Sequence, residues 1–345
     1  MSLTTPDVRF SVAPMMDWTD RHDRFFLRLM SRRARLYTEM VTANAIRFGE
    51  RSKLLDFNAE EHPLALQLGG SEPDALAEAA KIGVDWGYDE INLNVGCPSD
   101  RVQSGSFGAC LMQEPDRVAD CVAAMRAAVN VPVTVKSRIG VDDQDPHEAL
   151  FTLVEKCKNA GVMHFIVHAR KAWLEGLSPK ENRDIPPLDY DLVYQLKVAH
   201  PELLISINGG IETLAESITH LEQVDGVMLG RAPYKNPYLL AEVDGRLFGD
   251  AKAVPSRGEV AEQLIPYAER LVAKGTPLHA LTRHVMGLFQ GQPGGRLWRR
   301  YLSENTPRRG DDPQVLAEAL AVVEAEQAKK VAYAASSPQA QGAAQ

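Results

Sequence analysis

Reactive side chains stand at the ends of several short β-type runs in this sequence. Cys97 follows a glycine and precedes a proline where the run 90–96 ends. The glycine relaxes the alternation of the strand, so the thiol can leave the strand direction and serve as a nucleophile or as a general acid. The other cysteines, Cys110, Cys121 and Cys157, fit buried positions in or beside helical segments. No C-x-x-C pair occurs, which predicts reduced thiols and no zinc site.

Three more runs end in side chains that suit a bound ring. In the run 132–140, alternation places Thr134 and Lys136 on the inner face. A lysine there can stabilise negative charge on a ring or, with a lowered pKa, form a Schiff base. His168 can donate a hydrogen bond to a cofactor heteroatom or be a satisfied core histidine. Gln67 offers both a donor and an acceptor, which suits a ring with a mixed edge or a simple bond to the backbone.

Glycines close the last two β-type runs. The closing residues are Asn208, Gly209 and Gly210 after the seventh run, and Gly230 and Arg231 after the eighth. Backbone N–H groups at glycines beside a helix start bind phosphate well, and an arginine adds a two-pronged contact. The pattern predicts a ligand that carries a phosphate.

Eight β-type runs alternate with amphipathic segments along the chain. The runs are 9–16, 36–42, 63–70, 90–96, 132–140, 165–170, 203–210 and 226–232. The clearest helical segments are 72–82, 113–129, 147–160 and 213–224. Eight alternations favour a parallel (β/α)8 TIM barrel over residues 1–249, although an open doubly wound sheet gives a similar pattern. The carboxyl ends of barrel strands meet on one face, so the side chains above are expected in one site.

The sequence after the barrel has a different character. Residues 250–258 read as a linker, and residues 259–332 show only helical periodicity. We therefore expect a small all-α domain there. The segment 333–345 is small and polar, which predicts a disordered tail.

The charge pattern bears on possible partners. The net charge of -8 excludes a protein-wide basic field, so a polyanion must be met locally. Residues 283–309 contain six arginines and a single acid, Glu304. A second basic set, Arg24, Arg28 and Arg32, has the spacing of one helix face, and we interpret it as solvated. No apolar run could span a bilayer, and nothing points to an obligate protein partner. We expect a cytoplasmic location.

Several of these segments together closely resemble the tRNA-dihydrouridine synthase family. They are APMMDWTDRHDRFFLR, NLNVGCPSDRV, VPVTVKSRIG, VHARKA, SINGGI and MLGRAPYKNP, which span residues 13–236. GLFQGQPGGRLWRRYLSEN and LSPKENRDIPPLDY resemble the A-type branch of the family in particular. The resemblance covers the whole predicted barrel and extends into the helical region.

The resemblance implies an FMN-binding barrel in which NADPH reduces the flavin and a D-loop uridine of tRNA, at position 20 or 20a, is reduced. Hydride would pass from flavin N5 to C6 of uracil, and Cys97 would protonate C5. The implied FMN contacts are Pro14, Met15, Met16, Gln67, Lys136, His168, Asn208, Gly209, Gly210, Gly230 and Arg231. Asn94 would hold the target base. The implied tRNA contacts are Lys180, Arg183, Arg296, Arg299 and Arg300.

Other readings of the same residues compete with this one. A flavin barrel could act on a free pyrimidine, Lys136 could serve an aldolase, or an inert barrel could bind RNA. The first two give no reason for the basic helical region, and the third gives no reason for Cys97, Lys136 and His168 together.

Overall fold

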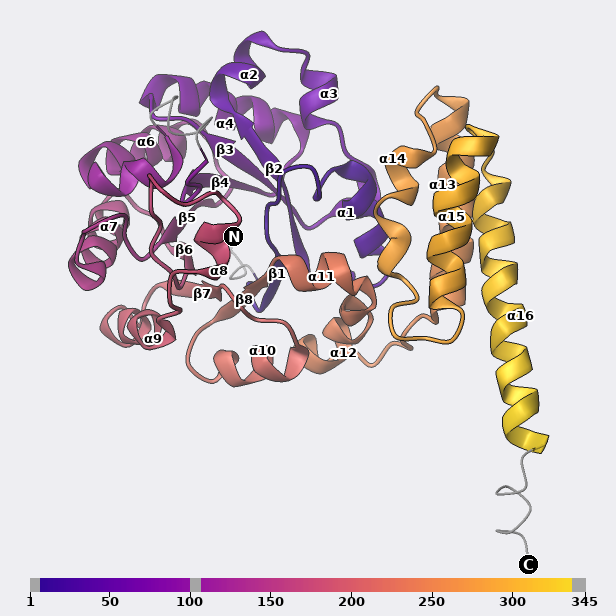
Figure 1. Ribbon diagram of the computed structural model, residues 1–345. Coiled ribbons are helices and arrows are strands. Elements are labelled where there is room, and N and C mark those ends of the chain that lie inside the picture. Colours follow the sequence, from indigo (N-terminus) through magenta and orange to yellow (C-terminus); the bar gives the residue numbers. More distant parts are fainter. Residues whose placement is uncertain (1–6, 100–106, 337–345) are drawn as a thin grey trace, which may run out of the picture. The chain divides into compact units, whose positions relative to one another are not determined.

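The computed structural model describes residues 7–99 and 107–336. Eight parallel strands pair in sequence order, and β1 also pairs with β8, so the sheet closes into a barrel (Figure 1). The strands are β1 Phe10–Val12, β2 Arg35–Thr42, β3 Leu64–Gly69, β4 Glu90–Val95, β5 Val133–Arg138, β6 His164–His168, β7 Leu204–Asn208 and β8 Gly226–Leu229. The predicted (β/α)8 barrel is therefore confirmed, and each β-type run overlaps one strand, although β2 and β6 begin one residue before their runs.

Helices and 3-10 turns connect the strands of the barrel. They are α1 Arg21–Arg28, α2 Ala43–Phe48, α3 Arg51–Leu55, η1 Ala59–Glu61, α4 Pro73–Trp86, η2 Gly108–Gln113, α6 Pro115–Ala128, α7 Pro146–Asn159, α8 Glu181–Asp184, α9 Tyr190–Ala199, α10 Leu214–Leu221 and α11 Arg231–Lys235. Proline opens α4, α6 and α7, where its fixed φ suits the first helical position. At α10, Thr213 and Glu216 form a reciprocal capping box.

Side-chain alternation on β4 explains how one strand serves both the core and the site. Ile91, Leu93 and Val95 are fully buried on one side of the strand. Asn92 and Asn94 lie on the other side, where both hydrogen-bond with Gln67 of β3. The period of two therefore separates an apolar outer face from a polar inner face, as the sequence predicts.

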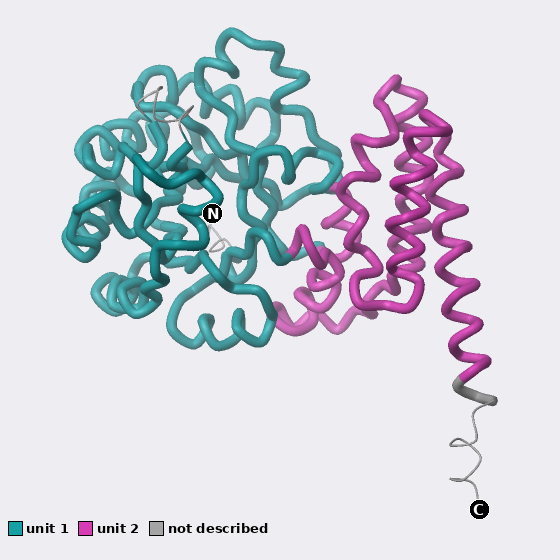
Figure 2. The backbone as a smooth tube through the Cα atoms, viewed as in Figure 1, with its two compact units in different colours: residues 1–24, 32–232 teal, residues 25–31, 233–345 magenta. Residues whose placement is uncertain are grey.

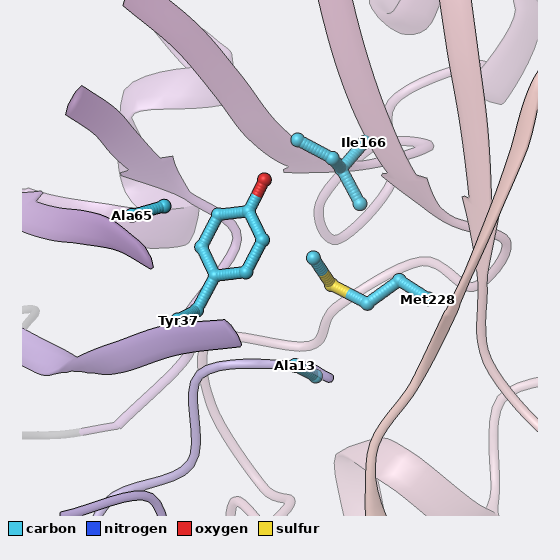
Figure 3. Close-up of a cluster of buried hydrophobic side chains, with 5 residues drawn as sticks. All are labelled: Ala13, Tyr37, Ala65, Ile166 and Met228. Carbon is cyan, nitrogen blue, oxygen red and sulfur yellow. The ribbon is translucent and has the colours of Figure 1, made fainter. Parts of the chain in front are cut away.

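The barrel interior is filled by side chains rather than open. Figure 3 shows Ala13, Tyr37, Ala65, Ile166 and Met228 converging from different strands and from the segment after β1. Each is at most 6% exposed. Ala13 and Met228 also line the cavity described below, so this apolar cluster forms part of the floor of that cavity.

The chain divides into two compact units, drawn in different colours in Figure 2. Unit 1 comprises residues 1–24 and 32–232, and unit 2 comprises residues 25–31 and 233–345. The elements of unit 2 after residue 232 are η3 Pro237–Glu242, α12 Val243–Phe248, α13 Arg257–Ala273, α14 His279–Thr282, η4 Val285–Gly287, α15 Gly295–Arg309 and α16 Gln314–Ser336.

These bounds differ from the sequence expectation of a barrel to residue 249. Residues 233–249 group with unit 2, where Ser31 hydrogen-bonds Asp244 and Phe25 stacks on Tyr267 at 3.8 Å. Such long-range contacts leave no periodic pattern in the sequence. Helix α13, the first long helix after residue 232, begins at Arg257. This start lies inside the expected linker, because the side chain of Ser256 caps the helix.

The disordered tail expected over residues 333–345 overlaps the end of a helix. Helix α16 continues to Ser336, so residues 333–336 are helical, and residues 337–345 lie outside the described part of the chain. No helix among the described residues is long and apolar enough to cross a membrane.

The interpretation of Arg24 and Arg28 as solvated is wrong, because both side chains are buried. Arg24 Nε lies 2.6 Å from Glu61 Oε2, and its Nη1 donates to the Thr19 carbonyl. Arg28 donates to the carbonyl of Ser31. Helical spacing identifies a common face but does not tell which face is covered. Arg24 is on a covered face because it pairs with Glu61, which lies 37 residues further along the chain.

Candidate active site

A cavity of about 490 Å³ lies at the carboxyl ends of the barrel strands. Each strand, or the segment that follows it, contributes to the wall. The volume falls in the range of roughly 300–1,000 Å³ that suits a cofactor or small ligand. The predicted cofactor residues in the wall are Pro14, Met15, Met16, Gln67, Lys136, His168, Asn208, Gly209, Gly210, Gly230 and Arg231. Asn94, Cys97 and Arg183 line the same cavity.

Sequence reasoning missed some residues of the wall, including Trp18, Met40 and Glu212. Arg138, which stands two residues beyond Lys136 on β5 and on the same face by alternation, also lines the cavity. No local pattern in the sequence indicated Met40. The register of β2 against β3 shifts between Tyr37 and Met40, and this irregularity reverses the alternation along β2.

Positive charge dominates the cavity wall. Among the described residues that line it, the lysine and arginine side chains are Lys136, Arg138, Arg183 and Arg231, and the only carboxylate is Glu212. Arg231 forms an ion pair with Asp184 at 2.8 Å, so it is partly neutralised already. The remaining excess of cations favours an anionic ligand.

Burial changes the protonation of two cavity residues. Burial, and after it the nearby Arg138 guanidinium, lowers the pKa of Lys136 to about 7. Lys136 Nζ donates to Asn208 Oδ1 at 3.0 Å, which is a neutral partner. Burial, and after it the charges of Arg138 and Lys136, hold the pKa of His168 well below its usual value. His168 is therefore neutral near pH 7, with one ring nitrogen able to donate a hydrogen bond.

The turn after β7 requires glycine at two successive positions. Gly209 has φ 113° and Gly210 has φ 73°, both in the left-handed region. A Cβ on Gly209 would lie 2.5 Å from His168 Cδ2, and one on Gly210 would lie 2.6 Å from Leu188 Cδ1. The Tyr190 hydroxyl donates to the Gly209 carbonyl at 2.7 Å and fixes the peptide. Both glycines line the cavity, so no side chain of their own separates their backbone from it.

Cys97 is held by its own loop. The backbone N–H groups of Gly96 and Cys97 both donate to Asn94 Oδ1 at 3.0 Å. Gly96 is required for close packing, since an added Cβ would lie 3.2 Å from the carbonyl carbon of Ser137, and its φ is not in the left-handed region. The thiol is half-buried, with Sγ 3.5 Å from Ser99 Oγ. A proton donor or nucleophile at the cavity wall is thus fixed by backbone hydrogen bonds.

The other cysteines occupy structural positions, as the sequence predicts for them. Cys121 and Cys157 are fully buried in α6 and α7, and burial raises the pKa of each to about 12. Cys110 is half-buried and its Sγ lies 3.0 Å from the Phe107 carbonyl.

Arg138 connects two loops at the cavity rim. Its Nε donates to the Gly96 carbonyl at 3.2 Å, and its Nη1 donates to the carbonyls of Lys171 and Asn182 at 3.1 and 2.9 Å. One buried guanidinium therefore joins the loop of Cys97 to the segment that follows β6.

The predicted tRNA contacts fall into two places. Lys180 and Arg183 lie on the segment after β6, where Arg183 lines the cavity and Lys180 is exposed. The other three lie on α15 of unit 2, namely Arg296, Arg299 and Arg300. The buried side chains of α15, among them Trp298 and Leu302, mark its opposite side. The three arginines therefore share a face that is exposed or half-exposed.

Comparisons with known proteins identify the family of this chain. The family model described as Dihydrouridine synthase (Dus) matches residues 11–331, which is most of the chain. The chain belongs to the dihydrouridine synthase family. Curated relatives include proteins named tRNA-dihydrouridine(20/20a) synthase from Shewanella oneidensis, 60% identical over 90% of this chain and 92% of the relative, and from Escherichia coli K12, 58% identical over 91% of each. A relative with the same name from Synechocystis is 59% identical over 90% of this chain and 93% of its own length.

A solved structure also resembles this member of the dihydrouridine synthase family. A complex of 2-naphthoyl-CoA reductase matches with a TM-score of 0.53 and 14% identity, over 68% of this chain and 49% of the other. At that identity the likeness concerns the fold alone.

Proposed function

We propose that this chain reduces uridine to 5,6-dihydrouridine in tRNA, using FMN as bound cofactor and NADPH as reductant. The observation that carries the proposal is one cavity in which Cys97, Lys136, His168 and the glycines after β7 and β8 come together in a member of the dihydrouridine synthase family. The names of the curated relatives support tRNA as the substrate and positions 20 and 20a as the reduced uridines.

The residues of the cavity fit FMN. The excess of cations suits its phosphate, and the turn after β7 offers backbone N–H groups at Gly209 and Gly210, which line the cavity and where a Cβ would clash with neighbouring side chains. Asn208, Gly230 and Arg231 would complete the phosphate site. Gln67, Lys136 and His168 would contact the ring, while Pro14, Met15 and Met16 would contact it through their backbone.

When bound and reduced, FMN supplies a hydride for C6 of the uracil. Cys97 gives the proton that C5 needs, so the C5–C6 double bond becomes a single bond and the thiolate recovers a proton from solvent. Lys136, as a cation, would stabilise the negative charge of the reduced flavin ring. Neutral His168 would donate a hydrogen bond to the same ring. Asn94 can offer the base one N–H only, because its oxygen already accepts two backbone hydrogen bonds and its nitrogen donates to Gln67.

The uridine must leave the folded tRNA to enter the cavity. Extruding a base costs roughly a few kcal/mol, which contacts to phosphates must offset. Lys180 and Arg183 at the cavity, and the three arginines on α15, are proposed to provide these contacts. NADPH would reach the cavity before the tRNA does. We place the enzyme in the cytoplasm, with free thiols such as Cys97 and Cys110 as support.

Two measurements test the function. Dihydrouridine should be missing at positions 20 and 20a in tRNA from a strain that lacks the gene, and the purified protein should restore it with FMN and NADPH. A protein that binds no FMN, or tRNA with unchanged dihydrouridine, would refute the proposal.

The Cys97→Ala variant tests the proposed acid. We expect FMN affinity to be retained and tRNA reduction to slow about 100-fold or more, the usual contribution of a positioned acid. Cys110→Ala is the matched control, because this half-buried thiol lies outside the cavity wall. Unchanged turnover of Cys97→Ala would mean that another group protonates C5.

The low pKa of Lys136, about 7, also suits a Schiff-base aldolase, which is the second candidate. Borohydride in the presence of small aldehydes or ketones would trap such an adduct on Lys136. The first proposal expects no adduct and a yellow protein with FMN bound.

A further inference from the structure

A continuous line of hydrogen bonds begins at the loop of Cys97 and enters the barrel. The N–H groups of Gly96 and Cys97 donate to Asn94 Oδ1 at 3.0 Å. Asn94 Nδ2 donates to Gln67 Oε1 at 2.9 Å, and Gln67 Nε2 donates to Asn92 Oδ1 at 2.8 Å. The amides of β3 and β4 are thus joined head to tail.

The line continues to a buried carboxylate. Asn92 Nδ2 donates to Thr134 Oγ1 at 2.8 Å, and the Thr134 hydroxyl donates to Glu90 Oε1 at 2.7 Å. The same oxygen accepts a hydrogen bond from the Tyr37 hydroxyl at 2.6 Å, and Glu90 Oε2 lies 3.5 Å from Arg35 Nη1. Glu90 is 1% exposed, so the anchor of the line is inside the barrel.

Both ends of this line have a fixed hydrogen-bonding role. Backbone N–H groups only donate, so the atom of Asn94 that meets Gly96 and Cys97 must be its oxygen. A carboxylate only accepts, so the hydroxyl of Thr134 must point toward Glu90. Every amide between the two ends then has a single orientation, and each donor points toward Glu90. Bonds aligned in this way polarise and strengthen one another in a buried setting.

We propose that Glu90, Thr134 and Asn92 are positioning residues for the cavity, acting through the amides of Gln67 and Asn94. This inference rests on the proposed function for its catalytic consequence. Gln67 and Asn94 line the cavity, whereas Glu90, Asn92 and Thr134 do not. Within the hydrogen bonds of the described residues, each of the two cavity amides uses one N–H of its NH2 group and keeps the other. A ring bound in the cavity would therefore face N–H donors of fixed direction. Such donors favour carbonyl oxygens and ring nitrogens that accept hydrogen bonds.

The same line also holds the thiol loop. If Asn94 turned its amide over, its NH2 group would face two backbone donors and both hydrogen bonds would be lost. A Gln67 amide turned over would set its NH2 group against that of Asn94 and strain this arrangement, and the orientation of Gln67 depends on Asn92. A change at Thr134 should therefore reach Cys97, although the two residues make no direct contact in the line.

The test compares Thr134→Val with Thr134→Ser in the full chain. Valine keeps the branched shape and removes the hydroxyl, while serine keeps the hydroxyl. We expect Thr134→Val to weaken FMN binding about tenfold, to slow single-turnover tRNA reduction by the reduced enzyme at least tenfold, and to shift the visible absorption band of bound FMN. Thr134→Ser should stay within about threefold of the wild type on both constants.

A third readout needs neither FMN nor activity. Alkylation of Cys97 in the chain without FMN, measured by mass spectrometry on its peptide, should be several-fold faster in Thr134→Val than in Thr134→Ser. Equal rates, together with unchanged FMN affinity, would overturn the inference even if the melting temperature fell, because a purely structural role predicts only that fall. If the wild type makes no dihydrouridine, the proposed function fails. The alkylation rate of Cys97 and the affinity for FMN still test this inference in that case.

A second variant covers the case in which Thr134→Val does not fold. Asn92→Leu removes both the acceptor of Gln67 and the donor to Thr134, so Gln67 loses the partner that sets its orientation. We expect this variant to bind FMN about tenfold more weakly and to speed alkylation of Cys97. A folded Asn92→Leu with unchanged FMN affinity and an unchanged alkylation rate would overturn the inference.

Discussion

The charge state of Lys136 should make FMN binding depend on pH. The buried ammonium has a pKa of about 7 against an ordinary value of 10.5, and its hydrogen-bond partner is the neutral amide of Asn208. Among the ion pairs of the described residues, none includes Lys136. The phosphate of bound FMN, held beside Asn208, would add negative charge to the cavity and raise this pKa, so binding above pH 7 should take up a proton.

The sign and size of the effect follow from this linkage. Below pH 7 the lysine is already charged, and the affinity should not depend on its titration. As pH rises from 7 to 9, the free energy needed to protonate Lys136 on binding increases. The affinity for FMN should therefore fall by up to about tenfold per pH unit. The phosphate has its second pKa near 6, so it stays doubly ionised in this window. Arg138, whose burial lowers its pKa to about 10, stays charged below pH 9.

Quenching of FMN fluorescence at several pH values between 6.5 and 9 measures this dependence. Lys136→Met should bind FMN more weakly at pH 7 and with a nearly flat pH profile, while Lys136→Arg should keep a charge throughout and also be flat. Calorimetry in two buffers of different ionisation enthalpy would count the proton taken up at pH 8. A wild-type affinity that is constant from pH 7 to 9, or an equal slope in Lys136→Met, would refute the reasoning.

Two further predictions concern the phosphate turn and the basic helix. Gly209→Ala should weaken FMN binding at least tenfold, because its Cβ would lie 2.5 Å from His168; Gly275→Ala is the control, because its φ of 77° is also in the left-handed region but nothing lies within 4 Å of the added Cβ. Unchanged FMN affinity in Gly209→Ala would show that the turn does not approach the cofactor. Arg299→Ala with Arg300→Ala should weaken tRNA binding and reduce the slope of log affinity against log salt by about 1 to 2, without changing NADPH oxidation by the flavin. Arg309→Ala is the matched control, since this arginine already pairs with Asp312 and Glu318, and an equal loss of slope in the control would count against the α15 face as the tRNA contact.

Much of the site could be read from local patterns in the sequence. Alternation placed Lys136 and Asn94 on the inner face, and the eightfold repeat of strand and helix located the ends of the strands. These inferences succeed because a strand has a period of two and because barrel closure brings all carboxyl ends to one face. The glycines at positions 209 and 210 were visible for a similar local reason, since their backbone lies in a region that other residues avoid.

Other features depend on contacts between distant segments, and no local pattern reports them. The irregularity in β2 turns Met40 into the cavity, and Glu61 converts Arg24 from an apparent surface residue into a buried ion pair. The resemblance implies that Asn94 contacts the base, and only the structure shows that its oxygen also holds the loop of Cys97 and that its amide belongs to a line of hydrogen bonds that ends at Glu90.

The sequence by itself determined which residues of the regular strands face inward and at which end of the strands the chemistry lies. The tertiary structure decided how those residues are oriented, which charges are neutralised, and where the two units divide. The physical reason is that period and glycine conformation are properties of a few neighbouring residues. Hydrogen-bond direction, burial and ion pairing are properties of groups that meet only when the barrel closes.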